Sequence, residues 1–368
     1  MKLKLVQKFV GTVLLTLAVS IGTTLAQPDS YSWQNLQSDI HGVAVRTDSN
    51  LVNPWGLAAS TGGTIWVANN GTGTSTLYAQ DGTANPLIVE IPKSRHNHDG
   101  ANPTGTVFNS TSFFVVTKDG TSGPSRFIFV SEDGSISGWN PQVDATHAII
   151  AVDNGGGGPH DGADSNKSST SPDNFGGGGH NRAIYKAAAL GVANDHNFLF
   201  VTNFRAGKVE TFNETFQRVN QNGFVDPSLP QGYAPFGIKN LDGQIYVTYA
   251  KQDQRKEDEV PGPGKGFVNV FDTSGTFIRR VVSMGSLNAP WGLALVDGEL
   301  WVGNFGDGKI NNYDPTTGGF LKTLSTEDGT PLQFDGLWDL LPLGDGVYFT
   351  AGIADEAHGL FGIITEDK

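Results

Sequence analysis

The chain has 368 residues, with 24 Lys and Arg against 37 Asp and Glu, and its net charge is −13. This charge argues against a nucleic-acid partner, because binding to phosphates needs a basic face. The absence of cysteine excludes disulfides, thiol catalysis and thiolate metal sites. Its 49 glycines and only 17% charged residues are typical of many short strands joined by tight turns.

Residues 1–26 have the pattern of a secretory signal peptide. Three lysines precede an uncharged apolar run over 9–21, and Thr-Leu-Ala at 24–26 forms a cleavage site. A membrane anchor is the alternative, but the run is short for a span of roughly 20 residues. No later segment is long and apolar enough to cross a membrane. We therefore expect a secreted protein, periplasmic if the source is Gram-negative, whose mature chain is 27–368.

An apolar strand pattern of aromatic, branched and small residues recurs along the mature chain. Its aromatic positions are 46 to 71 residues apart, and the shorter intervals match the roughly 40–50 residues of a four-stranded propeller blade. The six copies are TIWVAN (64–69), RFIFVSE (126–132), FLFVTN (198–203), QIYVTY (244–249), ELWVGN (299–304) and GVYFTA (346–351).

A second strand pattern precedes each of these copies, as NPWGLAAS (53–60) precedes the first. Proline at its start and glycine after a large residue fit an inner strand packed closely around a central axis. Thr104 is the exception among the large residues. The aligned aromatic residues, which we expect to pack between blades or near the axis, are Trp55, Tyr185, Phe236, Trp291 and Trp338.

The sixth repeat ends at GLFGIITEDK without a fourth strand. Residues 31–46 have strand-like stretches, and we predict that they supply the missing outer strand and close the ring. A β-sandwich has strands at similar spacing but does not explain six matching strand pairs. The sequence therefore predicts an all-β chain that forms one six-bladed β-propeller domain over 27–368.

Several long strings make the chain resemble a known family. They include NNGTGTSTLY (69–78), RFIFVSEDGSISGWN (126–140) and YFTAGIADEAHGLFG (348–362). The family consists of secreted six-bladed propellers without an established activity, related to NHL-repeat and SMP-30-like propellers. The resemblance therefore implies the fold and no particular chemistry. Two segments are longer than in the family pattern, 93–102 and 153–182.

Three long connections should emerge on one face of the propeller: 93–102, 153–182 and 250–266. In a four-stranded blade, the link between second and third strands and the link to the next blade leave the same face. The opposite face receives short turns, except around 117–125. Long loops on a rigid scaffold commonly carry function, although loops also lengthen neutrally, without gaining a function. We expect the elaborated face to bind the ligand.

Oxygen-bearing side chains should gather near the channel on this face. Carboxylate and amide oxygens suit calcium, and metal-dependent lactonases of the SMP-30-like group place such a site at the channel mouth. Asparagine at a strand end also commonly caps a turn, so both interpretations stay open. The candidate ligands are Asn69, Glu132, Asn203, Asn304, Asp307, Asp335 and Asp355.

Two functional hypotheses follow. The leading one is a monomeric, non-catalytic binding or scaffold module that recognises an extracellular protein or glycan through the elaborated face. The alternative is a calcium-dependent hydrolase of the lactonase type, acting at the channel mouth. If the source is eukaryotic, four Asn-x-Ser/Thr sequons are glycosylation candidates: Asn70, Asn109, Asn166 and Asn213.

Overall fold

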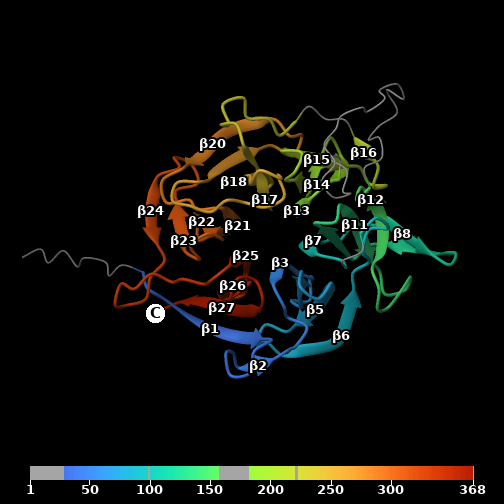
Figure 1. Ribbon diagram of the computed structural model, residues 1–368, viewed down its shortest axis with the longest axis horizontal. Helices are drawn as coiled ribbons and strands as arrows, with labels where there is room; N and C mark the ends of the chain where they lie inside the picture. Colours follow the sequence, from blue (N-terminus) through green and yellow to red (C-terminus); the bar gives the residue numbers. More distant parts are fainter. Residues whose placement is uncertain (1–28, 98–99, 157–181, 220–222, 368) are drawn as a thin grey trace, which may run out of the picture.

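The computed structural model describes residues 29–97, 100–156, 182–219 and 223–367. Within them, six sheets of four or five strands stand around a central axis as blades (Figure 1). The predicted six-bladed, all-β propeller is confirmed. The described part of the chain has no helix of the length and hydropathy that a bilayer span requires. The predicted signal peptide, 1–26, lies outside the described residues.

Blades one to three follow one another along the chain. Blade one contains β3 (Pro54–Ala59), β4 (Ile65–Asn69), β5 (Thr74–Tyr78) and β6 (Ala84–Glu90). Blade two contains β7 (Pro103–Phe108), β10 (Phe127–Ser131), β11 (Ser135–Trp139) and β12 (Ile149–Asp153), with an added hairpin of β8 (Val115–Lys118) and β9 (Thr121–Pro124). Blade three contains β13 (Tyr185–Ala193), β14 (His196–Asn203), β15 (Lys208–Phe212) and β16 (Arg218–Val219).

Blades four to six complete the circle. Blade four contains β17 (Tyr233–Leu241), β18 (Gln244–Lys251), β19 (Phe267–Phe271) and β20 (Phe277–Ser283). Blade five contains β21 (Pro290–Val296), β22 (Glu299–Asn304), β23 (Ile310–Tyr313) and β24 (Phe320–Thr323). Blade six contains β25 (Leu337–Leu343), β26 (Gly346–Ala351), β27 (Leu360–Glu366), β1 (Tyr31–Ser38) and β2 (Arg46–Thr47).

The N-terminal strand closes the ring by joining the last blade. β1 pairs antiparallel with β27, from Tyr31 opposite Glu366 to Ser38 opposite Leu360. The prediction that 31–46 supplies the missing outer strand is confirmed. Because both ends of the described chain share one sheet, the first and last blades are held together and β27 is not left as an open edge.

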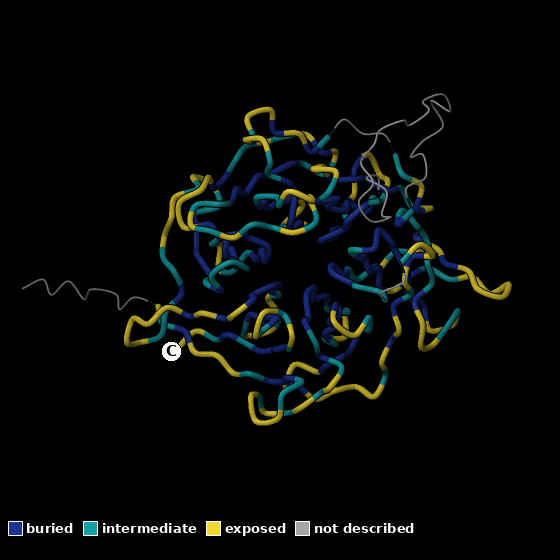
Figure 2. The backbone as a smooth tube through the Cα atoms, in the orientation of Figure 1, coloured by how far each residue is buried: buried dark blue, intermediate teal, exposed yellow. Residues whose placement is uncertain are grey.

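The inner strands are buried and the outer strands are more exposed (Figure 2). Glycine lets neighbouring inner strands approach closely around the axis. A Cβ atom at Gly56 would lie 2.6 Å from the backbone oxygen of Thr104, and one at Gly292 would lie 2.6 Å from that of Trp338. Any other residue at these two positions would therefore force adjacent blades apart.

Blade three departs from the predicted alignment by one residue. Tyr185 pairs with Asn203, the last residue of its second strand, and this is the place that Pro54 holds in blade one. Lys186, and not Tyr185, therefore occupies the position of Trp55. Blade three lacks the proline that begins the inner strand in four of the other blades. Because no proline marks the start of this strand, the sequence alignment matched Tyr185 to the aromatic residues of the other blades.

Candidate functional site

Aromatic side chains fill the central channel, four of them from inner strands and Phe305 from the turn after β22. Trp338 stacks on Trp55 with ring centroids 3.4 Å apart, and Phe305 stacks on Trp338 at 4.2 Å. Trp291 meets Trp338 edge-on at 5.9 Å, and Phe236 does so at 6.0 Å. All of them except the half-buried Phe305 are buried. These five residues form an aromatic plug, so the axis is packed and is not an open pore.

Lys186 takes an aromatic position beside this plug and brings a charge to the axis. Its side chain is 1% exposed, and Nζ donates a hydrogen bond to Oε1 of Glu132 at 2.5 Å. Nζ also lies 5.2 Å from the centre of the Trp55 ring, 5.7 Å from that of Phe204 and 6.0 Å from that of Phe236. Aromatic faces at such distances stabilise a cation. Lys186 is therefore held by the Glu132 carboxylate and three rings, and Asp258 accepts a second, longer hydrogen bond from Nζ.

Four carboxylates surround Lys186 at the channel mouth: Glu132, Asp258, Glu259 and Glu356. The Oδ1 atom of Asp258 lies 3.3 Å from Nζ, and the other two act on the ammonium through space. Burial alone would lower the pKa of Lys186, but the carboxylates outweigh burial and raise it. Lys186 is therefore charged. We call these five residues the mouth cluster.

Two members of the mouth cluster hold protons more tightly than ordinary glutamates do. Burial raises the pKa of Glu259 to about 7 despite the attraction of Lys186, and repulsion from Glu356 and Asp258 adds to the rise. Burial likewise raises the pKa of Glu356, whose Oε2 accepts a hydrogen bond from Nδ2 of Asn53 at 2.7 Å. One ammonium therefore compensates only part of the negative charge.

Asparagine amides connect the mouth cluster to the aromatic plug. Oδ1 of Asn53 accepts a hydrogen bond from Nε1 of Trp338 at 3.1 Å, while its Nδ2 atom binds Glu356. Nδ2 of Asn70 donates to Oε2 of Glu132 at 3.0 Å. Asn53 thus links the plug to Glu356, and the two asparagines hold Glu132 and Glu356 in place.

The long connection between β18 and β19, residues 252–266, reaches this cluster. It contributes Asp258 and Glu259, and Glu257 forms an ion pair with Arg205 of blade three. The side chain of Gln252 donates to the backbone oxygen of Phe204 at 2.6 Å. The connection is therefore attached to the neighbouring blade beside the channel.

The two other long connections meet at blade two, as far as they are described. Ser94 donates from its backbone nitrogen to Asp133 at 2.6 Å and from Oγ to Asp153 at 2.7 Å. Asp133 directly follows Glu132 of the mouth cluster. Residues 93–97 and 153–156 thus lie on the same face as the cluster. The rest of the 153–182 connection, up to residue 181, falls outside the described residues.

The strand-end asparagines do not belong to the mouth cluster. The amides of Asn69 and Asn203 donate to side chains on the third strands of their own blades, at 3.0 and 3.1 Å. Nδ2 of Asn304 donates to Asp307 at 3.0 Å. Hydrogen bonds within a blade are what turn-capping asparagines make, and this was the alternative that the sequence left open.

Of the predicted oxygen ligands, Glu132 alone lies in the mouth cluster. Ser131 pairs with Pro103 at the start of the inner strand, as Asn69 pairs with Pro54 in blade one. Glu132 therefore corresponds to Asn70, whereas the sequence alignment matched it with Asn69. Asp335 accepts a hydrogen bond from the backbone of Ala354, and Asp355 is exposed. In the described ranges, no group of three or more His, Cys, Asp or Glu side chains is arranged to hold a metal ion.

The predicted glycosylation sequons lie in unlike surroundings. Asn70 is 7% exposed and binds Glu132, and Asn109 is fully buried with its amide donating to two backbone oxygens. A glycan at either position would require these contacts to break. Asn213 is half-buried near a turn, and Asn166 lies outside the described residues.

Sequence reasoning missed Lys186, Asp258 and Glu259 as site residues. A signal for Lys186 was present, because a lone lysine stands in the otherwise apolar inner strand of blade three. If the inner strand had been aligned from the second strand, FLFVTN (198–203), the alignment would have placed Lys186 at the axis. Asp258 and Glu259 had no such signal, since they lie in a long connection with several other charged residues.

Comparisons with known proteins were made for sequence and for fold, and no protein-family model matches the chain. Uncharacterized protein R648 of Acanthamoeba polyphaga mimivirus is 30% identical over 340 residues, which cover 88% of this chain and 78% of that protein. This chain belongs to the same family. The resemblance to an uncharacterised family of six-bladed propellers is confirmed.

Two solved structures share the propeller fold. A streptogramin B lyase has a TM-score of 0.52 at 14% identity, and the match covers 93% of this chain and 99% of that one. A virginiamycin B lyase from Staphylococcus aureus has a TM-score of 0.50 at 15% identity, covering 91% of this chain and 99% of that one. At such low identity the likeness establishes the fold of this family member and leaves its activity open.

Proposed function

We propose that this chain is a secreted binding module whose channel mouth holds a basic side chain of an extracellular protein. The observation that supports this proposal is the excess of carboxylate in the mouth cluster. Glu132, Asp258, Glu259 and Glu356 share a single ammonium, that of Lys186. Such an arrangement favours any cation that can reach the exposed carboxylates.

A second cation at the mouth would relieve the crowding of charge. Glu259 is partly protonated near neutral pH, because its pKa is about 7. An incoming ammonium or guanidinium would favour its ionised form, so binding would release a proton. The ionised site binds the cation better, and affinity should therefore increase as the pH rises through about 7. This coupling distinguishes the mouth cluster from ordinary surface acids.

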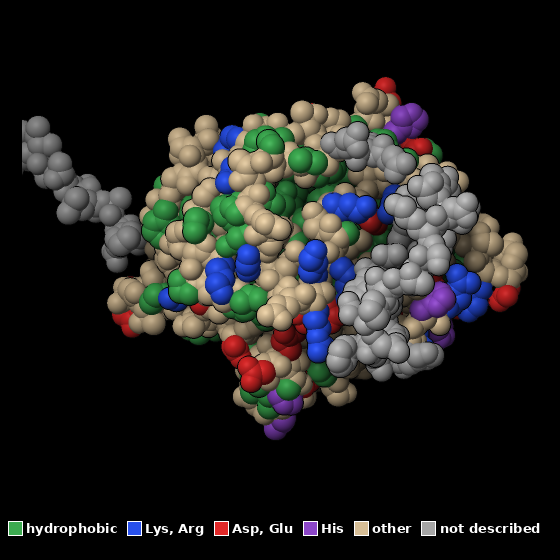
Figure 3. All heavy atoms as spheres, turned by 45° about the horizontal axis from the view of Figure 1, so that its top comes forward, with side chains coloured by type: hydrophobic (Ala, Val, Ile, Leu, Met, Phe, Trp, Pro, Cys, Tyr) green, Lys and Arg blue, Asp and Glu red, His purple; other side chains and the backbone are tan. Residues whose placement is uncertain are grey.

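The surroundings of the cluster favour a protein partner. Asp258 is 71% exposed and lies on the long 252–266 connection, which offers backbone and polar groups for further contacts. On the face turned to the viewer in Figure 3, one group of Asp and Glu side chains lies below the centre, other acidic side chains are scattered along the rim, and Lys and Arg are spread over the face. The rings of Trp55 and Trp338 are at most 2% exposed, so they offer no platform on which a sugar could stack.

The same cluster supports a second candidate function. A carboxylic acid with a pKa of about 7 next to a fixed ammonium is suited to general acid–base catalysis. Glu259 would exchange the proton, and Lys186 would stabilise developing negative charge. The lyases that share the fold are compatible with this candidate and do not favour a particular reaction, because their identity to this chain is 14–15%.

Calorimetric titration with a hexa-arginine peptide tests the binding proposal, with hexa-citrulline as the uncharged control. We expect binding of hexa-arginine alone, tighter at about pH 8 than at about pH 6. The double variant Glu132→Gln, Glu356→Gln should bind at least about tenfold more weakly, since each change removes a charge with little change of shape and leaves one acceptor oxygen. Asp242→Asn, in an exposed turn, is the control. Equal affinity for the double variant, or affinity independent of pH, would overturn the proposal.

A further inference from the structure

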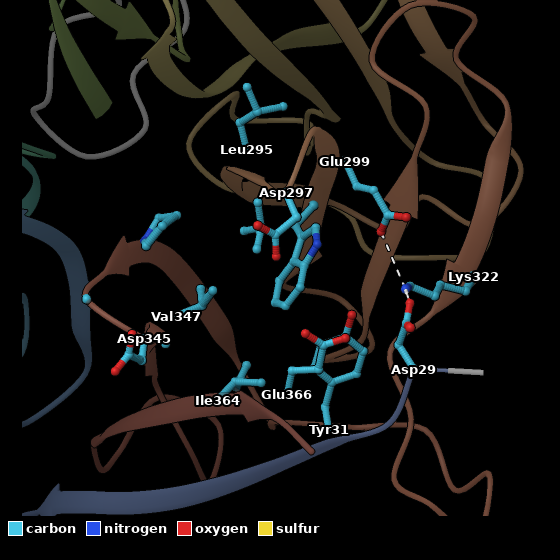
Figure 4. A pocket seen from close by; sticks show the side chains of 15 residues that line it. Asp29, Tyr31, Leu295, Asp297, Glu299, Lys322, Asp345, Val347, Ile364 and Glu366 are labelled. Carbon is cyan, nitrogen blue, oxygen red and sulfur yellow. Dashed lines mark hydrogen bonds and ion pairs between the residues drawn. The ribbon is translucent and has the colours of Figure 1, made fainter. Parts of the chain in front are cut away.

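A cavity lies at the seam between blades five and six, away from the channel mouth (Figure 4). Its volume is 480 Å³, within the range of about 300–1,000 Å³ that small-molecule sites occupy. The turns after the inner strands of these blades form one side, and β1 with β27 forms the other. The cavity is therefore built from both ends of the chain.

Part of the wall of this seam cavity is apolar. The ring of Tyr31 meets that of Trp301 edge-on at 5.4 Å, and both residues are buried. Leu295, Val347 and Ile364 continue the lining (Figure 4). A ligand with a hydrocarbon part would bury that part here, at a gain of about 25 cal/mol per Å² of apolar surface.

Lys322 shows that the seam cavity accommodates an ammonium group. Its Nζ atom donates a hydrogen bond to Asp29, lies 3.5 Å from Oε2 of Glu299 and sits 5.5 Å from the centre of the Tyr31 ring. Burial alone would lower the pKa of Lys322, but hydrogen bonds with Asp29 and Tyr31 outweigh burial and raise it. The chain thus already binds one of its own ammonium groups at this wall.

Three other carboxylates of the lining have no hydrogen-bond or ion-pair partner within the described residues: Asp297, Asp345 and Glu366. All three are exposed, and Figure 4 shows Asp345 at the end of the cavity away from Lys322. Lys322 is already shared between Asp29 and Glu299. The cavity therefore combines an apolar wall with negative charge that no group of the described residues pairs with.

We propose that the seam cavity binds a small aliphatic amine. Its ammonium group is held by Asp297, its carbon chain lies against Val347 and Ile364, and Asp345 and Glu366 add negative charge to the lining. A metal ion would leave the apolar wall unused, and a neutral ligand would leave the carboxylates uncompensated. Because the amine touches Asp297 of blade five and both Val347 and Ile364 of blade six, it bridges two neighbouring blades, and its binding stabilises the folded ring.

Thermal unfolding with 1,5-diaminopentane tests this proposal, at constant ionic strength. We expect the diamine to raise Tm by a few degrees at millimolar concentration, whereas 1-pentanol does not. Asp297→Asn should weaken the binding about tenfold without disturbing the turn, since Asn tolerates its φ of 49°. Asp242→Asn is the matched control, because Asp242 has a φ of 50° at the same turn of blade four.

Two outcomes would overturn the amine site. Equal shifts in the Asp297→Asn protein and its Asp242→Asn control would show that the diamine acts elsewhere. An equal shift with calcium chloride would show that the lining responds to any cation. The Glu132→Gln, Glu356→Gln protein should bind the diamine normally, so failure at the channel mouth and failure at the seam are separate results.

Discussion

Replacing Lys186 with Met would test whether the buried ammonium holds the mouth cluster together. Met has a similar length and packs flexibly against Trp55 and Phe236, so the change removes the charge with little change in volume. It leaves Glu132 without its cation, and it brings four carboxylates together with no compensating charge. The variant should fold, with a loss of stability that comes from charge and not from a cavity.

The size of this loss follows from the burial of the pair. Removing one partner of a buried ion pair costs about 3–5 kcal/mol. The side chain of Glu132 is 24% exposed, so solvent screens part of the penalty and we expect about 3 kcal/mol. An unfolding entropy of about 2.1 cal/mol/K per residue, over about 340 residues, is about 0.7 kcal/mol/K. The expected decrease in Tm is then about 4 °C.

Differential scanning calorimetry measures this decrease, and Lys118→Met is the matched control. Lys118 pairs with Asp144 at 2.6 Å, close to the 2.5 Å of the buried pair, but its side chain is 43% exposed. The control should lose little stability. The loss in the Lys186→Met protein should also shrink at about pH 5, where its carboxylates can take up protons. Equal losses in both variants, or a loss independent of pH, would refute the reasoning.

Three further results are expected. Glu259→Gln should be more stable than the wild type at about pH 8, and this advantage should vanish below about pH 4.5. The raised pKa of Glu259 lowers the stability of the folded state as the pH rises from about 4.5 to about 7, and the loss is complete above that range; denaturant titrations at both pH values measure it. Deleting 27–46 removes β1 and should lower Tm markedly, and an unchanged Tm would contradict closure. Trp338→Ala should cost about 3–5 kcal/mol in urea unfolding, and the half-exposed Trp33→Ala much less.

Much of the fold was predictable because each blade repeats the same short-range requirements. Proline at the start of an inner strand and glycine two residues later, as at Pro54 and Gly56, mark where backbones approach closely at the axis. The closure was predictable too, since the last repeat lacks one strand and 31–46 provides it. These features depend on neighbours in the chain or on a count of strands, and a single sequence contains both.

The mouth cluster was less predictable, because a shift of one residue moves a side chain to the other side of a strand. Aligning Tyr185 with Trp55 hid Lys186, which is the residue that reaches the axis. For the strand-end asparagines the sequence left ligand binding and turn capping both open. Asn69 and Asn203 stand near the channel mouth in the pattern, but their amides are used within their own blades.

The sequence by itself determined the number of blades, their order and the segment that closes the ring, because these follow from repeated local patterns. Only the tertiary structure decided that Lys186, Glu132 and Glu259 meet at one end of the channel. They come from three different blades and are brought together by the curvature of the whole ring. The ionisation of these side chains could not be inferred from the sequence either, because the pKa of a carboxyl group depends on its burial and on the charges that surround it.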